Sequence, residues 1–282
     1  MKRLHFEKRK YGKELLIDAA NEQDLEFVDD VMSLSFYCLA FLKRASGSYQ
    51  LDLYRFELAD QLVLFIRPSQ INVVSGAQFD ECTLLFFEGG FLDEFFVDRN
   101  FIFKFGCFHS IGPPPFLTLD ASTFRKYYEL AGEIKSEIGS LTADSHHILR
   151  SLIYYLLMRL DQRYAGQYGL VRNPAVEAKF LEFQKLLFSS IRRIKQVEEY
   201  ANELNISRVH LNKLCQRYLS KTATQVIREH LITEIKKELK YSEKDFAEIA
   251  YEFNFSAPSN FSRFVKQMTG LSPQEHLAGL SN

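Results

Sequence analysis

Two short segments near the C-terminal end carry cations without acids, a composition suited to contact with phosphate groups. Residues 207–221 and 256–270 contain no Asp or Glu, and their cations are Arg208, Lys213, Arg217, Lys221, Arg263 and Lys266. The acids of this region lie in the segments just before them: Glu198, Glu199, Glu203, Glu243, Asp245, Glu248 and Glu252. This segregation predicts two helices that can approach nucleic acid. A solvated basic face is the alternative that charge alone leaves open.

The residues before the first basic segment predict a helix and a tight corner that hold it in place. Apolar residues recur at i, i+3, i+4 and i+7 (Val197, Tyr200, Ala201, Leu204). Asn205 tolerates the left-handed conformation that a helix-ending turn needs, Ile206 can fill the corner, and Ser207 is a good N-cap. A second apolar stripe then follows, at Leu211, Leu214, Cys215 and Tyr218. The pattern predicts a helix-turn-helix whose second helix is short enough to enter a major groove.

The same arrangement recurs 49 residues later. The first stripe is Phe246, Ile249, Ala250 and Phe253, and the second is Phe261, Phe264, Val265 and Met268. Asn254, Phe255 and Ser256 stand at the positions of Asn205, Ile206 and Ser207. One such hairpin is a weak signal, whereas two copies with the same corner residues strongly favour a tandem helix-turn-helix.

The first 120 residues have the pattern of a β domain. Five apolar or alternating runs predict strands, at 36–42, 49–58, 62–66, 82–87 and 101–105, with Gly, Pro, Ser and Asn between them. Short strands at this spacing indicate a sandwich or barrel. The many Phe residues of these runs are expected to be core rather than ligand-binding.

Helices are expected to follow, one over 123–138 capped by Ser122, and another over 146–163 capped by Asp144 or Ser145. The second has an apolar stripe (Ile148, Leu152, Tyr155, Leu156, Leu160) that can pack on the β domain or on a second subunit. We therefore expect an effector and dimerisation domain over 1–165, a linker over 166–174 and a helical domain over 175–282, in which a long helix at 222–240 joins the two units.

The bulk composition is that of an ordinary soluble protein with room for two domains. Of 282 residues, 46% are hydrophobic and 25% charged, with a net charge of −1. Residues 175–282 carry 16 Lys+Arg against 13 Asp+Glu, a modest excess. The four cysteines (Cys38, Cys82, Cys107, Cys215) form no CxxC pair and suggest buried, reduced thiols. A basic N-terminus without an apolar stretch after it predicts a cytoplasmic protein with no membrane contact.

The sequence gives no positive sign of catalysis or of a metal. Only His5 and His109 lie in the β half, far apart and without partners at ligand spacing. Phosphate-loop, nucleophile-elbow and paired-carboxylate patterns are missing. We therefore expect no enzymatic activity, no metal and no cofactor.

Residues 185–277 resemble the AraC/XylS family of bacterial transcription regulators. The likeness is most specific in the second unit, through Asp245–Ala250, Asn254-Phe255, Asn260–Phe264 and Gly270–Pro273. The first unit matches more loosely, at Ala201, Leu204, Ile206-Ser207, Leu211 and Lys213. The resemblance implies a cupin-like barrel as the N-terminal half. Departures from the family pattern are Asn254 and Lys221 in place of Gly, His230 in place of Arg, Ile235 in place of Ala, and His276 near the usual terminal aromatic/Arg pair.

The resemblance also assigns roles on the two basic helices. It places Val209, Asn212 and Lys213 toward base edges, where Asn can pair with adenine, Lys with guanine and Val with a thymine methyl. The matching positions on the second helix are Pro258, Ser259, Ser262 and Arg263, although plain solvent-facing polarity remains an alternative for the two serines. Arg208, His210, Arg217 and Lys266 are expected to contact phosphates, which position the protein without specifying sequence.

The function expected is sequence-specific regulation of transcription, with activation as the expected mode and repression left open. The expected partners are double-stranded DNA, a small-molecule effector in the N-terminal domain, a second copy of the chain and RNA polymerase. A cupin-type enzyme or binding protein with a helical appendage is the alternative, which an ordered metal or carbohydrate turnover would favour. A helical domain that binds protein is a third, which binding without salt dependence would favour.

Overall fold

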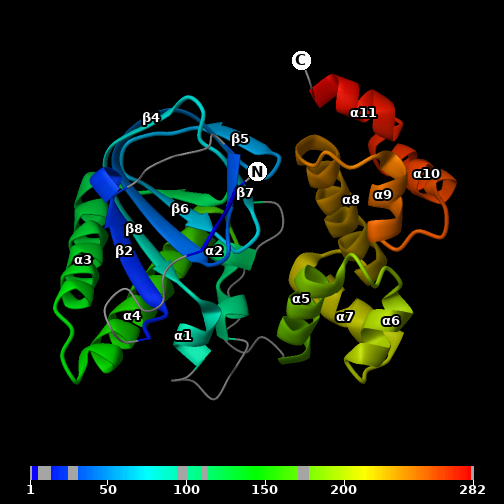
Figure 1. Cartoon of the computed structure of the whole chain (residues 1–282). Coiled ribbons are helices and arrows are strands. Elements are labelled where there is room, and N and C mark those ends of the chain that lie inside the picture. The colour runs from blue at the N-terminus through cyan, green and yellow to red at the C-terminus, as the bar shows by residue number, and fades with distance from the viewer. Residues whose placement is uncertain are drawn as a thin grey trace. The chain divides into compact units, whose positions relative to one another are not determined.

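The computed structural model describes residues 2–5, 14–24, 31–93, 101–109, 113–170 and 178–280. These fall into two compact units, residues 1–174 and 175–282. The N-terminal unit is a curled, mostly β structure followed by helices, and the C-terminal unit is built of helices (Figure 1). No helix in the described ranges is long and apolar enough to cross a membrane.

The sheet of the N-terminal unit is organised around one long strand. Its strands are β1 (Lys2–Leu4), β2 (Ile17–Asn21), β3 (Val31–Leu34), β4 (Tyr37–Leu51), β5 (Tyr54–Glu57), β6 (Leu62–Ile66), β7 (Ile71–Val73), β8 (Ala77–Phe87) and β9 (Phe116–Thr118). Strand β4 pairs with β5, β6, β7 and β8, all antiparallel. Its register with β8 shifts around Arg44. Such bulges bend a strand, which helps the sheet to curl.

The first part of β4, residues 37–42, is buried on both faces, which explains its unbroken apolar run. Leu39 and Phe41 pack in the cluster beneath the helices, whereas Cys38, Ala40 and Leu42 pack in the second cluster, on the opposite face of the strand. Because successive side chains of a strand point to opposite faces, a strand buried on both sides loses the apolar–polar alternation.

The helices of this unit are α1 (Gly89–Asp93), α2 (Gly106–His109), α3 (Ala121–Gly139) and α4 (Ser145–Gln167). Two long ones, α3 and α4, pack on each other and on the sheet (Figure 1). The N-cap of α3 is Asp120, not Ser122 as predicted, because its carboxylate accepts from the backbone N–H groups of Ser122 and Thr123. Helix α4 runs to Gln167, past the predicted end and into the predicted linker. Linker residues 171–174 lie outside the described ranges.

Two strand predictions were wrong. Residues 101–104 form a 3-10 helix, in which Ile102 is buried in the core cluster. Residues 49–58 hold the end of β4 and all of β5, because the chain turns back at Asp52, which has a φ of 56°. The short strands β1, β2, β3, β7 and β9 were not predicted, since runs of three to five residues are hard to tell from loops.

The C-terminal unit consists of α5 (Ala178–Ser190), α6 (Val197–Glu203), α7 (Arg208–Leu219), α8 (Ala223–Tyr241), α9 (Phe246–Glu252), α10 (Pro258–Thr269) and α11 (Pro273–Leu280). Both predicted corners have the same backbone. Asn205 has a φ of 52° and Asn254 a φ of 55°. In each, the residue after the Asn donates to a carbonyl five residues back, Ile206 to Ala201 and Phe255 to Ala250. This is the Schellman end of a helix, which needs a left-handed residue.

The two corners differ at the start of the second helix. Ser207 caps α7 by accepting from His210 N–H, but the N-cap of α10 is Ala257, one residue after the position that aligns with Ser207. Ser256 Oγ instead accepts from Asn260 Nδ2. The shift follows from Pro258, which lacks an N–H and fits the first helical position while keeping the preceding residue extended.

The left-handed corner gives a stability prediction at Asn205, whose side chain is exposed. Replacing Asn205 by Val should lower the free energy of unfolding by about 1–2 kcal/mol, because a β-branched residue is strained at positive φ. Replacing it by Gly should change that free energy little, since Gly adopts this conformation freely. Urea denaturation of the two variants measures the difference, and equal stabilities would contradict a strained corner.

Candidate nucleic-acid interface

Helix α7 is fixed by its buried side so that its polar side stays outward. Leu211, Leu214 and Cys215 are buried. The opposite side exposes Val209, at 64% of its surface, and Lys213, one turn further along. Lys213 has no hydrogen-bond or ion-pair partner among the residues that the structure describes. An exposed aliphatic side chain beside an unpaired ammonium group can meet a thymine methyl and a base acceptor.

Helix α10 presents a comparable stripe. Phe261 and Val265 are buried, while Ser259, Arg263 and Lys266 are exposed. The exposed three recur at i, i+4 and i+7, so they share one face. Pro258 and Ser262 are half-buried beside them. The structure therefore brings the predicted residues of this helix together at one surface.

One predicted base-facing residue is engaged elsewhere. Asn212 is half-buried, and its Oδ1 accepts from the backbone N–H of Ala223 at 2.9 Å, at the first residue of α8. Bidentate pairing with adenine uses both the side-chain oxygen and the side-chain nitrogen of Asn, so it needs that oxygen. Asn212 therefore connects α7 to the start of α8 and does not project freely outward as predicted. Only its Nδ2 is left to donate to a base.

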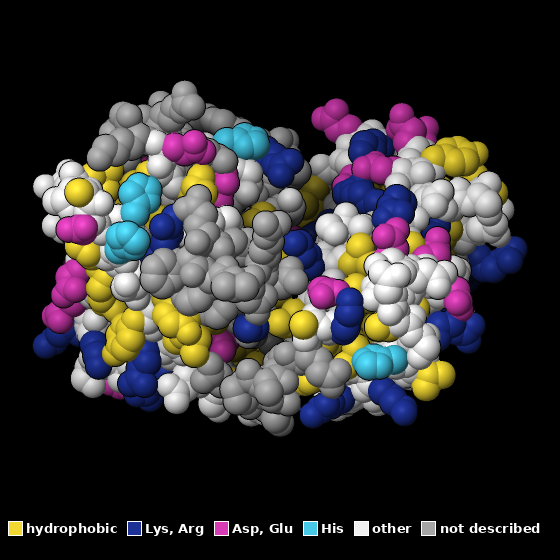
Figure 2. All heavy atoms as spheres, turned by 90° about the horizontal axis from the view of Figure 1, so that it is seen from below, with side chains coloured by type: hydrophobic (Ala, Val, Ile, Leu, Met, Phe, Trp, Pro, Cys, Tyr) yellow, Lys and Arg dark blue, Asp and Glu magenta, His cyan; other side chains and the backbone are white. Residues whose placement is uncertain are grey.

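The predicted phosphate contacts do not form one uncompensated cluster. Arg208 pairs with Glu198 of α6 at 3.1 Å, with both side chains more than half exposed. An exposed pair of this kind contributes about 0–1 kcal/mol, so a phosphate can displace the carboxylate. His210 and Arg217 are exposed on the same helix, and the Arg217 guanidinium lies 5.4 Å from the ring centre of Tyr218. Figure 2 shows Lys and Arg side chains spread over one face of this unit with acids between them.

Within the C-terminal unit, a set of contacts that the sequence did not predict connects the first helix-turn-helix to the second. Lys195, just before α6, donates to the carbonyls of Phe253 and Asn254 at the end of α9, at 2.9 Å for Phe253, and lies 4.0 Å from the ring centre of Phe255. In return, Asn254 Nδ2 donates to the Arg193 carbonyl. A cation at the C-terminal end of a helix is favourable because the helix dipole is negative there.

Arg192 extends the same connection. Its guanidinium bridges Glu238 of α8 and Glu252 of α9 and lies 4.8 Å from the ring centre of Phe253. Lys244 pairs with the same two carboxylates. We name Arg192 and Lys195, with their partners on α8 and α9, the inter-unit brace, because they connect the two helix-turn-helix units inside the C-terminal unit. The basic run at 192–195 was visible in the sequence, but its partners 46 to 60 residues away were not.

A second bridge joins the long helix to α10. Arg228 of α8 donates to Gln267 Oε1 at 2.7 Å, and its guanidinium lies 5.3 Å from the ring centre of Phe264. His230, which departs from the family pattern, is buried with its ring 4.8 Å from that of Phe188. The departure is thus accommodated by packing.

The four cysteines and His109 are buried in the core. All four cysteines are free and buried, and burial raises the pKa of Cys82 and of Cys215 to about 12, so these thiols stay protonated. His109 is buried with its Nε2 at 3.3 Å from the Tyr37 hydroxyl, and burial lowers its pKa. Within the described ranges, no three His, Cys, Asp or Glu residues form a group that could hold a metal ion.

The N-terminal unit contains an apolar hollow against the inner face of the sheet. Its volume is about 100 Å³, and Leu34, Cys38, Leu64 and Phe86 are among its lining residues. A buried polar pair borders it, in which the Tyr49 hydroxyl donates to Asn72 Oδ1 at 2.5 Å. The hollow can take apolar groups, with one hydrogen-bonding pair at its wall.

A family model described as a helix-turn-helix domain matches residues 200–278. Among solved structures, the chain is similar to a transcriptional regulator with an AraC-type DNA-binding domain from Chromobacterium violaceum (21% identity over 39% of this chain and 98% of that one, TM-score 0.34). It is also similar to ToxT from Vibrio cholerae (14% identity, 95% and 100%, TM-score 0.42) and to the DNA-binding domain of AdpA in complex with a target DNA (17%, 36% and 91%, TM-score 0.33). No curated protein matches the chain significantly.

The inter-unit brace gives a prediction at Lys195. Replacing Lys195 by Met keeps the aliphatic stem but removes the donor to two carbonyls at the end of α9. We expect the free energy of unfolding to fall by about 1–2 kcal/mol, the usual effect of losing charge-assisted hydrogen bonds of this kind. Urea denaturation measures it.

Lys185→Met is the matched control, because Lys185 is exposed on α5 and has no partner among the described residues. It removes the same charge from the same unit and should leave stability nearly unchanged. Equal losses in the two variants would show that the brace contributes nothing.

Proposed function

We propose that the chain is a DNA-binding transcription regulator of the AraC type, and that α7 and α10 of its helix-turn-helix domain are two recognition helices, each entering a major groove of the same duplex. The single observation that supports this most is the pair of matched surfaces. Each corner holds a left-handed Asn, and each following helix buries its apolar side and exposes a cation, Lys213 or Arg263, that has no partner in the described part of the chain.

Base contacts are proposed for Val209 and Lys213 on α7 and for Pro258, Ser259, Ser262 and Arg263 on α10. Asn212 would donate once through Nδ2 while its Oδ1 holds Ala223 N–H. Phosphate contacts are proposed for Arg208, His210, Arg217 and Lys266. Helix α8 and the inter-unit brace would set the distance between the recognition helices, and so the spacing of the two half-sites.

The N-terminal unit is proposed to be a cupin-like effector domain. The curled sheet with an inner apolar hollow supports this, and it favours an effector with a substantial apolar part. A hollow of about 100 Å³ is smaller than typical ligand pockets of roughly 300–1,000 Å³, so a larger effector would have to open the sheet. We propose that the protein acts by regulation, as an activator that contacts RNA polymerase, and not by catalysis.

Helix α4 is proposed as a surface for a second copy of the chain. Ile148 and Tyr155, seven residues apart, are 39% and 43% exposed, and the half-buried Leu152 lies between them. These three form a stripe beside the buried face of the helix. Figure 2 shows hydrophobic side chains exposed on the N-terminal unit, a surface of the kind that marks protein interfaces.

The test uses duplexes selected from random sequence by the full-length protein. Arg263→Ala and Lys213→Ala should each weaken binding to the selected site by about 1–3 kcal/mol, roughly 5- to 150-fold, and relax the preference at the contacted base. Lys266→Ala should weaken selected and unselected duplexes alike and reduce the slope of log affinity against log salt by about one. Fluorescence anisotropy at several salt concentrations measures these effects.

Lys185→Ala serves as the control, because it removes a cation from α5, outside the proposed surface. The proposal fails for this surface if Arg263→Ala and Lys213→Ala both bind as tightly as the unaltered protein. Binding that does not change with salt would instead favour a protein partner for the helical domain.

A further inference from the structure

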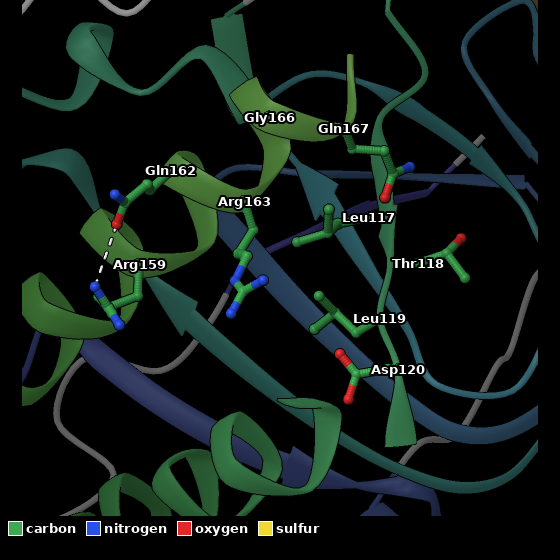
Figure 3. Close-up of a pocket in the computed structure, with 9 residues that line it drawn as sticks. All are labelled: Leu117, Thr118, Leu119, Asp120, Arg159, Gln162, Arg163, Gly166 and Gln167. Atoms are coloured by element: carbon green, nitrogen blue, oxygen red, sulfur yellow. Dashed lines mark hydrogen bonds between the residues drawn. The ribbon is translucent and has the colours of Figure 1, made fainter. Parts of the chain in front are cut away.

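The N-terminal unit holds a second, larger hollow that is polar. It lies between the last two turns of α4 and the segment Leu117–Asp120, which runs from β9 to the start of α3, and its volume is about 510 Å³ (Figure 3). This is within the usual size of ligand sites. It shares no lining residue with the apolar hollow of the sheet.

Two arginines on one face of α4 supply its charge. Arg159 and Arg163 are four residues apart, so their side chains lie on the same side of the helix. Arg159 donates from Nη1 to Gln162 Oε1 at 3.2 Å, but its Nε is buried with no hydrogen-bond partner. A buried donor without a partner is costly, which favours a ligand acceptor at this point.

Arg163 lacks a partner as well. Figure 3 shows its side chain extending from α4 toward Leu119 and Asp120, yet no ion pair or hydrogen bond to its guanidinium exists within the described ranges. A guanidinium that forms no ion pair presents its planar set of donors to a ligand that enters the hollow. Carboxylate and phosphate oxygens match that geometry best.

The opposite wall offers acceptors and further polar groups. Asp120 Oδ1 already accepts from Ser122 and Thr123, and these bonds hold the pKa of Asp120 well below its usual range. The amino end of α3 partly offsets the negative charge of this carboxylate. Its second oxygen, with Thr118 and Gln167 nearby, can accept from hydroxyl groups.

We propose that this hollow binds a small hydroxylated organic anion, with its carboxylate or phosphate group between Arg159 and Arg163 and its hydroxyl groups toward Asp120 and Gln167. The hollow also includes Gly166 and Gln167, the last residues of α4, from which the chain continues to the DNA-binding unit. A ligand that orders this turn can alter DNA binding, and only that consequence rests on the proposed function.

The experiment is isothermal titration calorimetry of the full chain with glucose 6-phosphate and with gluconate, which carry phosphate and carboxylate on comparable hydroxylated chains. At least one probe should bind, and Arg163→Gln and Arg159→Gln should each weaken that binding by about tenfold or more, the usual loss for a charge-assisted contact. Neutral glucose should not bind measurably, because it lacks the anionic group. The probe that binds distinguishes phosphate from carboxylate.

Two further measurements locate the site. Arg125→Gln is the matched control, since Arg125 is exposed on α3 without a partner among the described residues, and it should bind the probe as the unaltered protein does. The chain contains no Trp, so Gly166→Trp places a single Trp at the hollow, at a position where an added Cβ meets nothing within 4 Å, and its emission should change on addition of the probe.

Three results would overturn the proposal. The first is that the unaltered protein binds neither probe at millimolar concentration. The second is that a variant lacking both arginines, folded by circular dichroism, binds the probe unchanged. The third is that Arg163→Gln lowers affinity for DNA while no probe binds to the unaltered protein, since the arginines would then be a DNA contact. None of these measurements depends on the proposed base contacts, so the two proposals fail separately.

Discussion

The C-terminal unit depends on one set of charge-assisted contacts, the inter-unit brace. Lys195 and Arg192 precede the first helix-turn-helix, but their partners lie on α8 and at the end of α9. The corner that aims α10 is thus held by residues that belong to the other half of the domain. The proposed docking of α7 and α10 on one duplex requires a fixed separation and a fixed rotation between them, and these contacts restrain both.

The brace also gives a role to two of the acids, Glu238 of α8 and Glu252 of α9. Glu238 and Glu252 neutralise Arg192 and Lys244, so these cations are engaged inside the unit. Among the residues that the structure describes, Lys213, Arg263 and Lys266 form no ion pair or hydrogen bond of this kind, which leaves the outward faces of α7 and α10 positive. Arg208 lies between these cases, because Glu198 pairs with it at the surface. The acids and cations that are separated along the chain are therefore also separated in space, except that Arg208 pairs with Glu198.

The N-terminal unit is divided by its sheet into two environments. The long strand β4 sends alternate side chains into two apolar clusters, one of them beneath α3 and α4. The apolar hollow lies at the second cluster, the one that contains Cys38 and Ala40. The polar hollow lies between α4 and the segment Leu117–Asp120, and its lining includes Arg159 and Arg163. The two hollows suit different chemical groups, because an apolar wall gives a charged group nothing to replace its water.

The sequence by itself determined the local features of the helical unit. Buried stripes, left-handed Asn205 and Asn254 and the Ser207 cap follow from residue types a few positions apart, so they could be predicted. Only the tertiary structure decided that Asn212 braces Ala223, that Arg192 and Lys195 reach α8 and α9, and that Arg163 faces Asp120 across a hollow. These contacts depend on which distant segments meet. In the same way, the apolar run of β4 shows no alternation because residues on both of its faces are buried by segments far away in the sequence. Spacing along the chain carries no information about either.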